Sequence, residues 1–386
     1  MVGQSVVGVF SKLSRKCFKP ALTPALSPRR GSATGSVPNL WSLIAANLAS
    51  ENPDTEARIL DKCRLKTRPE DGSPSPGGEG GQHPQLVRKF LALLLLAVCL
   101  LYAARLTAAP VTVGVIGDFG SDYISTRQVA RLVKSWQPLC VLTLGDNNYP
   151  SGSAATIDRN IGQFYREFIG DYHGRYGVGA VTNRFFPCLG NHDWLTTNAQ
   201  PYLDYFTLPG NERYYTFKSG VVEFFCLDSD LKEPDGTSPD SAQGQWLKQQ
   251  LTNSTAVWKL VYFHHAPYSS GAIHGTHTGE TARMRWPFRE WGADAVLAGH
   301  DHLYERVHMN GLVYFVNGLG GDSRDKFHPV PVPGSAARYG GDFGALRIDA
   351  AENYILFRFI TRNGAQIDSY RMVPKPKAEV APSENK

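Results

Sequence analysis

Five short apolar runs, each followed closely by acidic, amide or imidazole side chains, constrain the fold of this chain most strongly. The runs are continuous and do not alternate with polar residues, which is typical of strands buried on both faces. They predict strands at Val111–Ile116, Leu139–Leu144, Phe185–Leu189, Val257–Phe263 and Ala295–Ala298. Amphipathic patterns between them predict helices at Ser125–Trp136, Thr156–Ile169, Ser241–Leu251 and Thr281–Glu290. This alternation predicts an α/β arrangement, in which loops at the carboxyl ends of the strands converge on a ligand site.

The pattern changes beyond residue 310, where helical periodicity stops. The remaining apolar runs predict antiparallel strands of a second sheet, at Leu312–Val316, Phe343–Ile348, Tyr354–Ile360 and Gln366–Tyr370. We therefore expect one domain over residues 110–373. The polar tail, residues 374–386, is expected to be disordered.

The first 86 residues have a different composition, rich in Pro, Gly, Ser and Arg. They have too little apolar periodicity to form a buried core, so we expect them to be disordered. Val87 begins a short basic stretch, which is followed by the apolar run Phe90–Ala104 and then by small residues. This order, over residues 87–109, is typical of a secretory signal peptide. The run is short for a membrane-spanning helix, which needs about 20 residues.

These features predict a secreted or periplasmic protein, tethered to a membrane only if residues 87–109 are retained as a signal anchor. Because a signal peptide belongs at the N-terminus, we hypothesise that translation begins near Val87. No Met lies between Met1 and Met284, so such a start would use a non-AUG codon.

The formal net charge of +5 arises outside the predicted domain. Residues 1–109 hold 14 Lys and Arg against 7 Asp and Glu, which leaves 26 basic and 28 acidic residues for the rest. The domain is therefore slightly acidic and has no basic stripe of the kind that binds nucleic acid. Cys140, Cys188 and Cys226 lie on predicted core strands, where free thiols are favoured, although one bridge plus one free thiol stays possible.

The polar residues that follow the five strands are metal-ligand types. They occur as Gly117-Asp118, Gly145-Asp146 with Tyr149, Gly190-Asn191-His192-Asp193, His264-His265 and Gly299-His300-Asp301-His302. Carboxylate, phenolate, amide and imidazole groups suit a borderline-to-hard first-row ion. One ion cannot hold seven such ligands and keep a position for water, whereas two ions sharing a carboxylate can. Two ions roughly 3.5–4 Å apart support in-line displacement at phosphorus, so the set predicts a two-metal hydrolytic centre.

This motif set resembles the calcineurin-like metallophosphoesterase superfamily, and Tyr149 narrows the resemblance to the purple acid phosphatases, the small tartrate-resistant type in particular. The resemblance covers roughly residues 111–372. It implies a four-layer α/β (α+β) sandwich, in which two mixed β-sheets are flanked by helices.

The resemblance also implies a ligand assignment. Fe(III) would be held by Asp118, Asp146, Tyr149 and His302, and charge transfer from the Tyr149 phenolate to this ion would give the purple colour. A second, divalent ion (Fe, Zn or Mn) would share Asp146 and bind Asn191, His265 and His300.

Four further residues, three of them within these motifs, are not assigned as ligands. His192 and His274 are expected to orient the substrate and protonate the leaving group, with Asp193 supporting His192. His264 and His265 would point to opposite faces of a strand, so only one can face the site. Spacing to Pro267 and His274 favours His265 as the ligand, which makes His264 a core or supporting residue.

The function predicted in this way is an acid phosphatase that hydrolyses small phosphomonoesters through attack by a metal-bound hydroxide. Protonated histidines predict an acidic optimum. A phosphodiesterase acting on nucleotides, nucleic acid or phospholipid head groups is the alternative, because the same metals serve both reactions. Loops at residues 151–156, 194–205 and 268–280 are expected to shape the cleft that decides between them. A metal-binding relic without catalysis is a third class, and the complete ligand set argues against it. The sequence predicts no oligomeric state.

Overall fold

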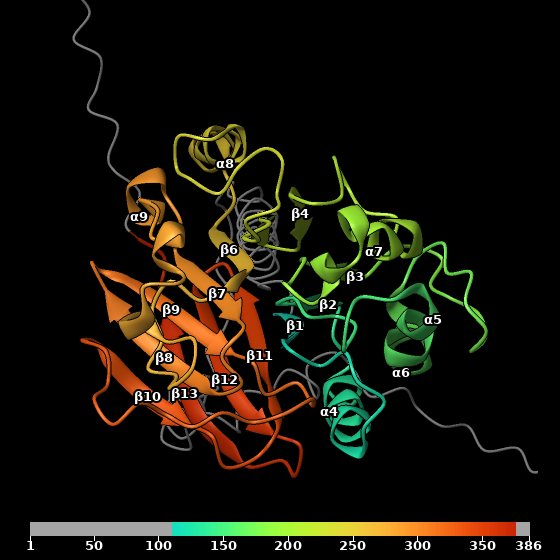
Figure 1. Ribbon diagram of the computed structural model, residues 1–386. Coiled ribbons are helices and arrows are strands. Elements are labelled where there is room, and N and C mark those ends of the chain that lie inside the picture. The colour runs from blue at the N-terminus through green and yellow to red at the C-terminus, as the bar shows by residue number, and fades with distance from the viewer. Residues whose placement is uncertain (1–109, 376–386) are drawn as a thin grey trace, which may run out of the picture. The chain divides into compact units, whose positions relative to one another are not determined.

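The computed structural model describes residues 110–375, which contain two β-sheets with helices on their outer faces (Figure 1). Both sheets are mixed, so the expected sandwich of two mixed sheets flanked by helices is confirmed. The expectations for residues 1–86, for residues 87–109 and for the tail beyond residue 375 lie outside the described residues. Within residues 110–375, no helix has the length and apolar character needed to cross a membrane.

The first sheet has six strands in the order β13-β12-β11-β1-β2-β3. Neighbours β1 and β2, and β2 and β3, run parallel, while the other pairs are antiparallel. The strands are β1 (Val111–Ile116), β2 (Cys140–Thr143), β3 (Phe185–Pro187), β11 (Gly344–Ala351), β12 (Tyr354–Thr361) and β13 (Gln366–Met372).

The second sheet has seven strands in the order β10-β8-β9-β7-β6-β5-β4. Its centre is parallel, through the pairs β5–β6, β6–β7 and β7–β9, and its edges are antiparallel. The strands are β4 (Tyr215–Ser219), β5 (Val222–Cys226), β6 (Trp258–His265), β7 (Ala295–Gly299), β8 (Tyr304–Met309), β9 (Leu312–Asn317) and β10 (Ser335–Tyr339).

The expectation that the C-terminal strands form a separate second sheet is wrong. Strands β11 to β13 extend the first sheet, because β11 pairs antiparallel with β1 and so covers an edge that would otherwise be unpaired. Strand β9 instead pairs with β7 in the second sheet, after a hairpin from β8 that we did not predict. The turn of this hairpin is Asn310-Gly311, with φ of 51° and 71°, and Asn-Gly is the strongest short hairpin signal in a sequence.

Two of the four predicted helices are confirmed, as α4 (Ile124–Ser135) and α8 (Ala242–Asn253). The side chain of Ser241 begins α8 by accepting a hydrogen bond from the Gly244 amide at 3.2 Å. The helix predicted at residues 281–290 is wrong, because Pro287 lacks an amide hydrogen and disfavours helical geometry before it. A 3-10 turn (Ala282–Met284) and the short α9 (Phe288–Trp291) take its place.

The helix predicted at residues 156–169 is interrupted by a π-helical turn. This turn brings Asn160 to the loop after β2, where its amide donates to Asn148 Oδ1 at 2.9 Å and to the Tyr149 carbonyl at 3.0 Å. Such turns are frequent at functional sites. The segment reads α5 (Ala154–Ile157), π turn (Asp158–Gly162), α6 (Gln163–Tyr165) and 3-10 turn (Arg166–Phe168). The remaining helices are α7 (Gln200–Tyr205) and 3-10 turns Asp193–Leu195, Thr197–Ala199 and Thr276–Thr278.

Aromatic side chains pack the two sheets together. Three stacked pairs cross the interface, with ring centroids 3.6 to 4.5 Å apart: Phe186–Phe217, Tyr304–Phe359 and Phe315–Phe357. On the outer face of the second sheet, Val261, Phe263 and Val296 are buried with residues of α8 and α9. The central strands are therefore buried on both faces, as their continuous apolar runs predict. Cys140, Cys188 and Cys226 are buried and free, which excludes a bridge among these three.

One carboxylate, that of Asp349, ties three strands of the first sheet together. Asp349 on β11 accepts hydrogen bonds from Thr112 Oγ1 at 2.7 Å, from Arg347 Nη2 at 2.9 Å and from Arg358. Burial acts to raise the pKa of Asp349, but these hydrogen bonds and the Arg347 charge outweigh it and lower the pKa below its usual value.

We expect Asp349→Asn to lower the free energy of unfolding by about 3 kcal/mol at pH 7, because two arginines lose a largely buried partner. A carboxyl group with a lowered folded-state pKa stabilises the fold above its unfolded pKa of about 3.9 and stops doing so as pH falls through the folded value. The difference between wild type and variant should therefore shrink towards pH 3. Urea unfolding at pH 7 and pH 3 measures both, and an equal difference at the two pH values would contradict this account.

Candidate metal centre

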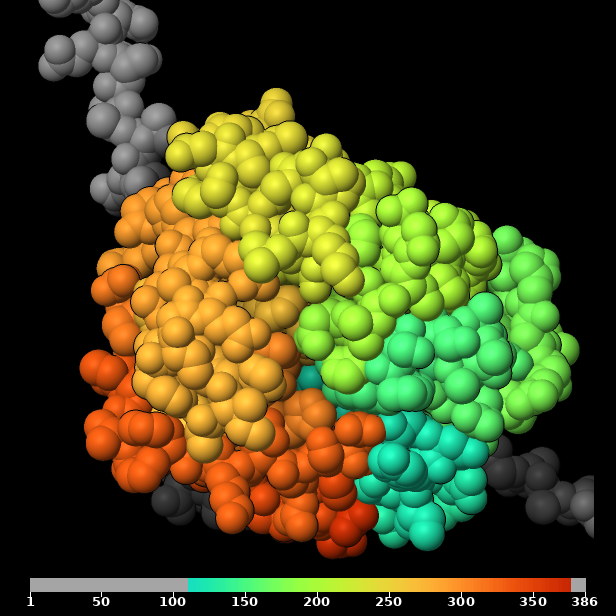
Figure 2. All heavy atoms as spheres, in the orientation of Figure 1, coloured from blue at the N-terminus to red at the C-terminus, as the bar shows by residue number. Residues whose placement is uncertain are grey.

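The candidate ligands converge where the carboxyl ends of parallel strands from both sheets meet. Loops after β1, β2 and β3 carry Asp118, Asp146 with Tyr149, and Asn191. Strand β6 ends with His265, and the loop after β7 carries His300 and His302. On the face shown in Figure 2, teal and green segments of the first half of the domain meet orange segments of the second half around a small recess. Residues separated by up to 184 positions in the chain thus lie side by side, as the sequence predicts.

One group consists of the Tyr149 hydroxyl oxygen and three donor atoms around it. The hydroxyl oxygen lies 2.9 Å from Asp146 Oδ2, 3.1 Å from His302 Nε2 and 3.4 Å from Asp118 Oδ1. His302 Nε2 lies 3.3 Å from Asp118 Oδ1. Four ligands held tetrahedrally at about 2.0 Å from one ion are about 3.3 Å apart. The four side chains therefore have the spacing of a single coordination sphere.

The charges in this group also favour a bound cation. Asp118 is fully buried, and burial together with the Asp146 and Asp118 carboxylates raises the pKa of the Tyr149 hydroxyl well above its usual value. Burial opposes charge on His302, but the adjacent Asp118 carboxylate raises the pKa of His302 to about 9. A proton on His302 is therefore favoured when no metal is bound. A cation among these side chains would replace that proton and stabilise the phenolate.

The backbone around these ligands is strained. Asp118, Asp146 and His300 have φ of 54°, 50° and 73°, in the left-handed region that costs non-glycine residues about 1–3 kcal/mol each. Gly190 packs so tightly that an added Cβ would lie 2.2 Å from the Asp146 amide nitrogen. Conformations of this kind are found where a site needs them, and here they direct side chains from the strand ends into the centre.

A second group contains Asn191, His265 and His300, which the structure also brings together. The rings of His265 and His300 lie 4.5 Å apart, and both side chains are buried. His264 Nε2 lies 2.9 Å from Asn191 Oδ1 and 3.2 Å from His300 Nδ1. Burial lowers the pKa of His265 and His300, which keeps their rings neutral, as metal ligation requires. Ser229 Oγ lies 2.8 Å from His265 Nδ1, and this hydrogen bond fixes the orientation of the ring.

The expectation that only one of the paired histidines faces the site is wrong. The rings of His264 and His265 lie 5.0 Å apart, and both contact residues of the second group. Strand β6 loses its regular pairing with β7 between Tyr262 and His265, so the alternation of side-chain faces does not hold there.

His192 and His274 lie at the rim, each with about a third of its side chain exposed (33% and 35%). His192 Nδ1 lies 2.6 Å from the Pro150 carbonyl oxygen, and its Nε2 lies 4.0 Å from Asp146 Oδ2. The ring of His274 lies 4.3 Å from that of His300. Both histidines are therefore next to the centre and accessible, as a substrate-binding or proton-donating role requires.

Two supporting residues differ from the sequence expectation. Asp193 does not hold His192, because its Oδ2 accepts hydrogen bonds from the Gly190 amide and the Asn147 side chain, both at 2.9 Å. It fixes the loops that carry Asp146 and Asn191 instead. Glu280 was missed: its carboxylate lies 3.1 Å from His274 Nδ1 and 3.6 Å from His300 Nε2. The only sequence signal was an acidic residue six positions after His274.

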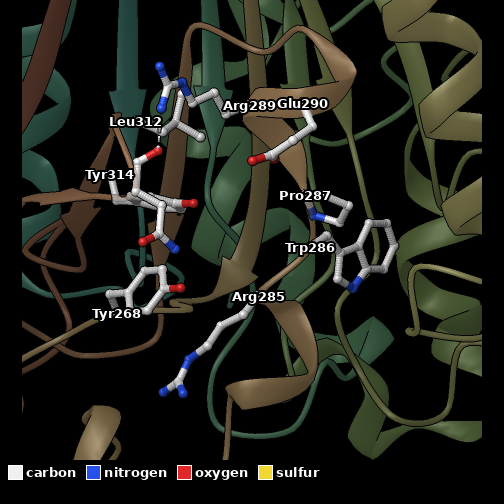
Figure 3. A pocket seen from close by; sticks show the side chains of 9 residues that line it. Tyr268, Arg285, Trp286, Pro287, Arg289, Glu290, Leu312 and Tyr314 are labelled. Carbon is white, nitrogen blue, oxygen red and sulfur yellow. Dashed lines mark hydrogen bonds between the residues drawn. The ribbon is translucent and has the colours of Figure 1, made fainter.

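A separate cavity of about 240 Å³ lies on the outer side of the second sheet (Figure 3). Its wall includes Tyr268, Trp286 and Tyr314, with Arg285 stacked 5.1 Å from the Tyr268 ring centroid. None of its nine lining residues is a candidate ligand, so this cavity is distinct from the metal centre.

The family of the protein follows from a sequence comparison. The model of the calcineurin-like phosphoesterases matches residues 111–304, half of the 386-residue chain, and the protein therefore belongs to this family. The match contains each of the seven candidate ligands, and it confirms the resemblance seen in the sequence motifs.

Several curated relatives are purple acid phosphatases. One from Glycine max is 26% identical over 238 residues, which cover 57% of this chain and 49% of the relative. The Fe(3+)-Zn(2+) purple acid phosphatase 12 of Arabidopsis thaliana is 25% identical over 242 residues, covering 57% and 49%. Mouse tartrate-resistant acid phosphatase type 5 is 25% identical over 239 residues, covering 53% and 71%. The chain thus spans about half the length of the first two.

Among solved structures, a purple acid phosphatase from yellow lupin (Lupinus luteus) seeds matches with a TM-score of 0.57. The two chains are 18% identical, and the match covers 69% of this chain and 54% of the lupin chain. At this level of identity the likeness concerns the fold.

Proposed function

We propose that this protein is an acid phosphatase that hydrolyses small phosphomonoesters at a binuclear metal centre. The observation that carries the proposal is the set of three donor atoms that lie 2.9 to 3.4 Å from the Tyr149 hydroxyl oxygen, beside a second group that contains the buried His265 and His300. Asp146 lies between the two groups. The name of the Arabidopsis relative, an Fe(3+)-Zn(2+) enzyme, supports Fe(III) at the first site and a divalent ion (Fe, Zn or Mn) at the second.

In this proposal Asp118, Asp146, Tyr149 and His302 hold the first ion, because a phenolate and two carboxylates suit a trivalent ion. The second ion takes its ligands from the histidine group and Asn191. When bound, the two ions would supply a nucleophilic water and offset the charge of the phosphate group.

The partly exposed histidines act on the substrate. His192 presents Nε2 to the centre, since its Nδ1 is held by the Pro150 carbonyl. His274 is oriented by the Glu280 carboxylate at 3.1 Å. Each would donate a hydrogen bond to a phosphate oxygen, and one would protonate the departing alcohol. Because donation requires the protonated ring, activity should be highest at acid pH.

The assay compares a phosphate monoester with the matching diester, p-nitrophenyl phosphate against bis(p-nitrophenyl) phosphate, from pH 4 to pH 9. A monoester preference of at least tenfold with an acidic optimum supports the proposal. A preference for the diester would assign the protein to the phosphodiesterases of the same family, and no turnover of either ester by the metal-loaded protein would refute both.

We further propose that residues 110–373 act outside the cytoplasm, secreted or periplasmic. This rests on the signal-like composition of residues 87–109 alone. Sequencing the N-terminus of the mature protein tests it, and a terminus upstream of residue 87 would contradict cleavage there.

A further inference from the structure

His264 has no role in the seven-ligand arrangement, yet its ring lies inside the site. The side chain is fully buried, and Nδ1 lies 2.7 Å from the Leu144 carbonyl oxygen. Because a carbonyl oxygen only accepts, Nδ1 carries the ring hydrogen and donates it. Nε2 is then the nitrogen that can present a lone pair to a cation. Histidines that bind metals are commonly fixed in this way, with the other nitrogen donating to a backbone carbonyl.

Nε2 lies close to three candidate ligand atoms. Nε2 lies 2.9 Å from Asn191 Oδ1, 3.2 Å from His300 Nδ1 and 3.5 Å from Asp146 Oδ2. Donor atoms bound at about 2.1 Å to one ion are separated by about 3.0 Å in an octahedron and 3.4 Å in a tetrahedron. Nε2 therefore lies at the separation expected between ligands of one ion from each of these three atoms.

The loop that carries Asp146 is shaped around this ring. Gly145, with φ of 86°, lies against it so closely that an added Cβ would stand 2.5 Å from His264 Nδ1. Nε2 faces acceptor oxygens at 2.9 and 3.5 Å in a buried place, where either a proton or a cation has to lie between the nitrogen and these oxygens. A bound cation would take the place of that proton.

We propose that His264 binds the second metal ion through Nε2, as a ligand in addition to Asp146, Asn191, His265 and His300. The inference rests on the proposed function, since it concerns the same centre. Five protein ligands leave one position of a six-coordinate ion for water or substrate. Three imidazoles among them favour zinc or ferrous iron over magnesium or calcium. The second site should accordingly be tighter and more selective than one built from two histidines.

The test measures zinc affinity of the second site in the full chain, by competition with a chromophoric chelator after the first site is filled with iron. His264→Asn keeps an amide nitrogen near the position of Nδ1, so the hydrogen bond to Leu144 can persist, but no atom occupies the position of Nε2. His264→Gln places its amide closer to that position. His277→Ala is the matched control, because His277 stacks on His328 outside the two ligand groups.

We expect His264→Asn to raise the zinc Kd at least about 100-fold, with a smaller rise in His264→Gln and none in the control. X-ray absorption of the zinc-loaded wild type should count three imidazoles, which tests the ligand without a variant. Wild-type affinity in His264→Asn, or two imidazoles in the spectrum, would overturn the inference while leaving the proposed function intact. The inference would also be overturned if the wild type bound one ion and His264→Asn bound two. The His264 ring would then occupy the place of the second ion. A wild type that binds no metal would refute the proposed function itself.

Discussion

Replacing Asp146 by Asn should abolish catalysis and release metal in one step. Asp146 Oδ2 lies 2.9 Å from the Tyr149 hydroxyl and 3.5 Å from His264 Nε2, which in turn contacts Asn191 and His300, so this carboxylate lies between the two ligand groups. Its other oxygen accepts a hydrogen bond from the His192 amide at 2.9 Å. An amide of the same shape keeps the packing but removes the negative charge that would bridge two cations.

The expected loss in kcat/KM is at least about 1,000-fold, which corresponds to about 4 kcal/mol of transition-state stabilisation. Steady-state kinetics with p-nitrophenyl phosphate and elemental analysis of the same sample measure the two effects together. Asp240→Asn is the control, because Asp240 is exposed and far along the chain from every ligand motif. If Asp146→Asn retained more than a tenth of the wild-type turnover, its bridging role would be refuted.

Replacing Tyr149 by Phe should remove the visible absorption of the protein. In the proposed centre the colour arises from the Tyr149 phenolate bound to Fe(III), and the variant lacks that oxygen. The first ion would keep Asp118, Asp146 and His302, so iron should remain, although bound more weakly. We expect turnover to fall at least about tenfold, since the change alters the environment of the ion directly.

A visible spectrum and an iron determination on one sample test this prediction. The matched control is Tyr165→Phe, because the Tyr165 hydroxyl is buried and has no hydrogen-bond partner among the described residues. That variant should stay coloured. A colourless wild type with iron bound, or an unchanged band in Tyr149→Phe, would show that Tyr149 is not the source of the colour.

The local sequence predicts the strands that carry the centre, because each is a continuous apolar run ending in polar residues. Val111–Ile116 is β1 without any shift in bounds, and Asp118 follows it as expected. Strand β1 pairs with β2 on one side, and the strand that pairs with it on the opposite side could not be predicted from the local sequence. Val111 pairs with Ala350 on β11, and no local pattern specifies a pairing across so much of the chain. The assignment of the C-terminal strands to the wrong sheet follows from this.

The errors within the site have a similar origin. Strand alternation turns His264 away from His265, but alternation holds only while regular pairing continues, and the pairing of β6 shifts after Tyr262. Glu280 reaches His274 and His300 through a loop whose course no periodic pattern describes. Ligand identity could be predicted from residue type and order, whereas the residues that position the ligands depend on tertiary contacts.

The central claim is that two metal ions bind side by side and share Asp146. Elemental analysis of the purified full-length protein, combined with its visible spectrum, tests this claim most directly. We predict two metal ions per chain, one of them iron, and a visible charge-transfer band. A protein that binds a single ion after reconstitution with iron and zinc, or none, would contradict the account.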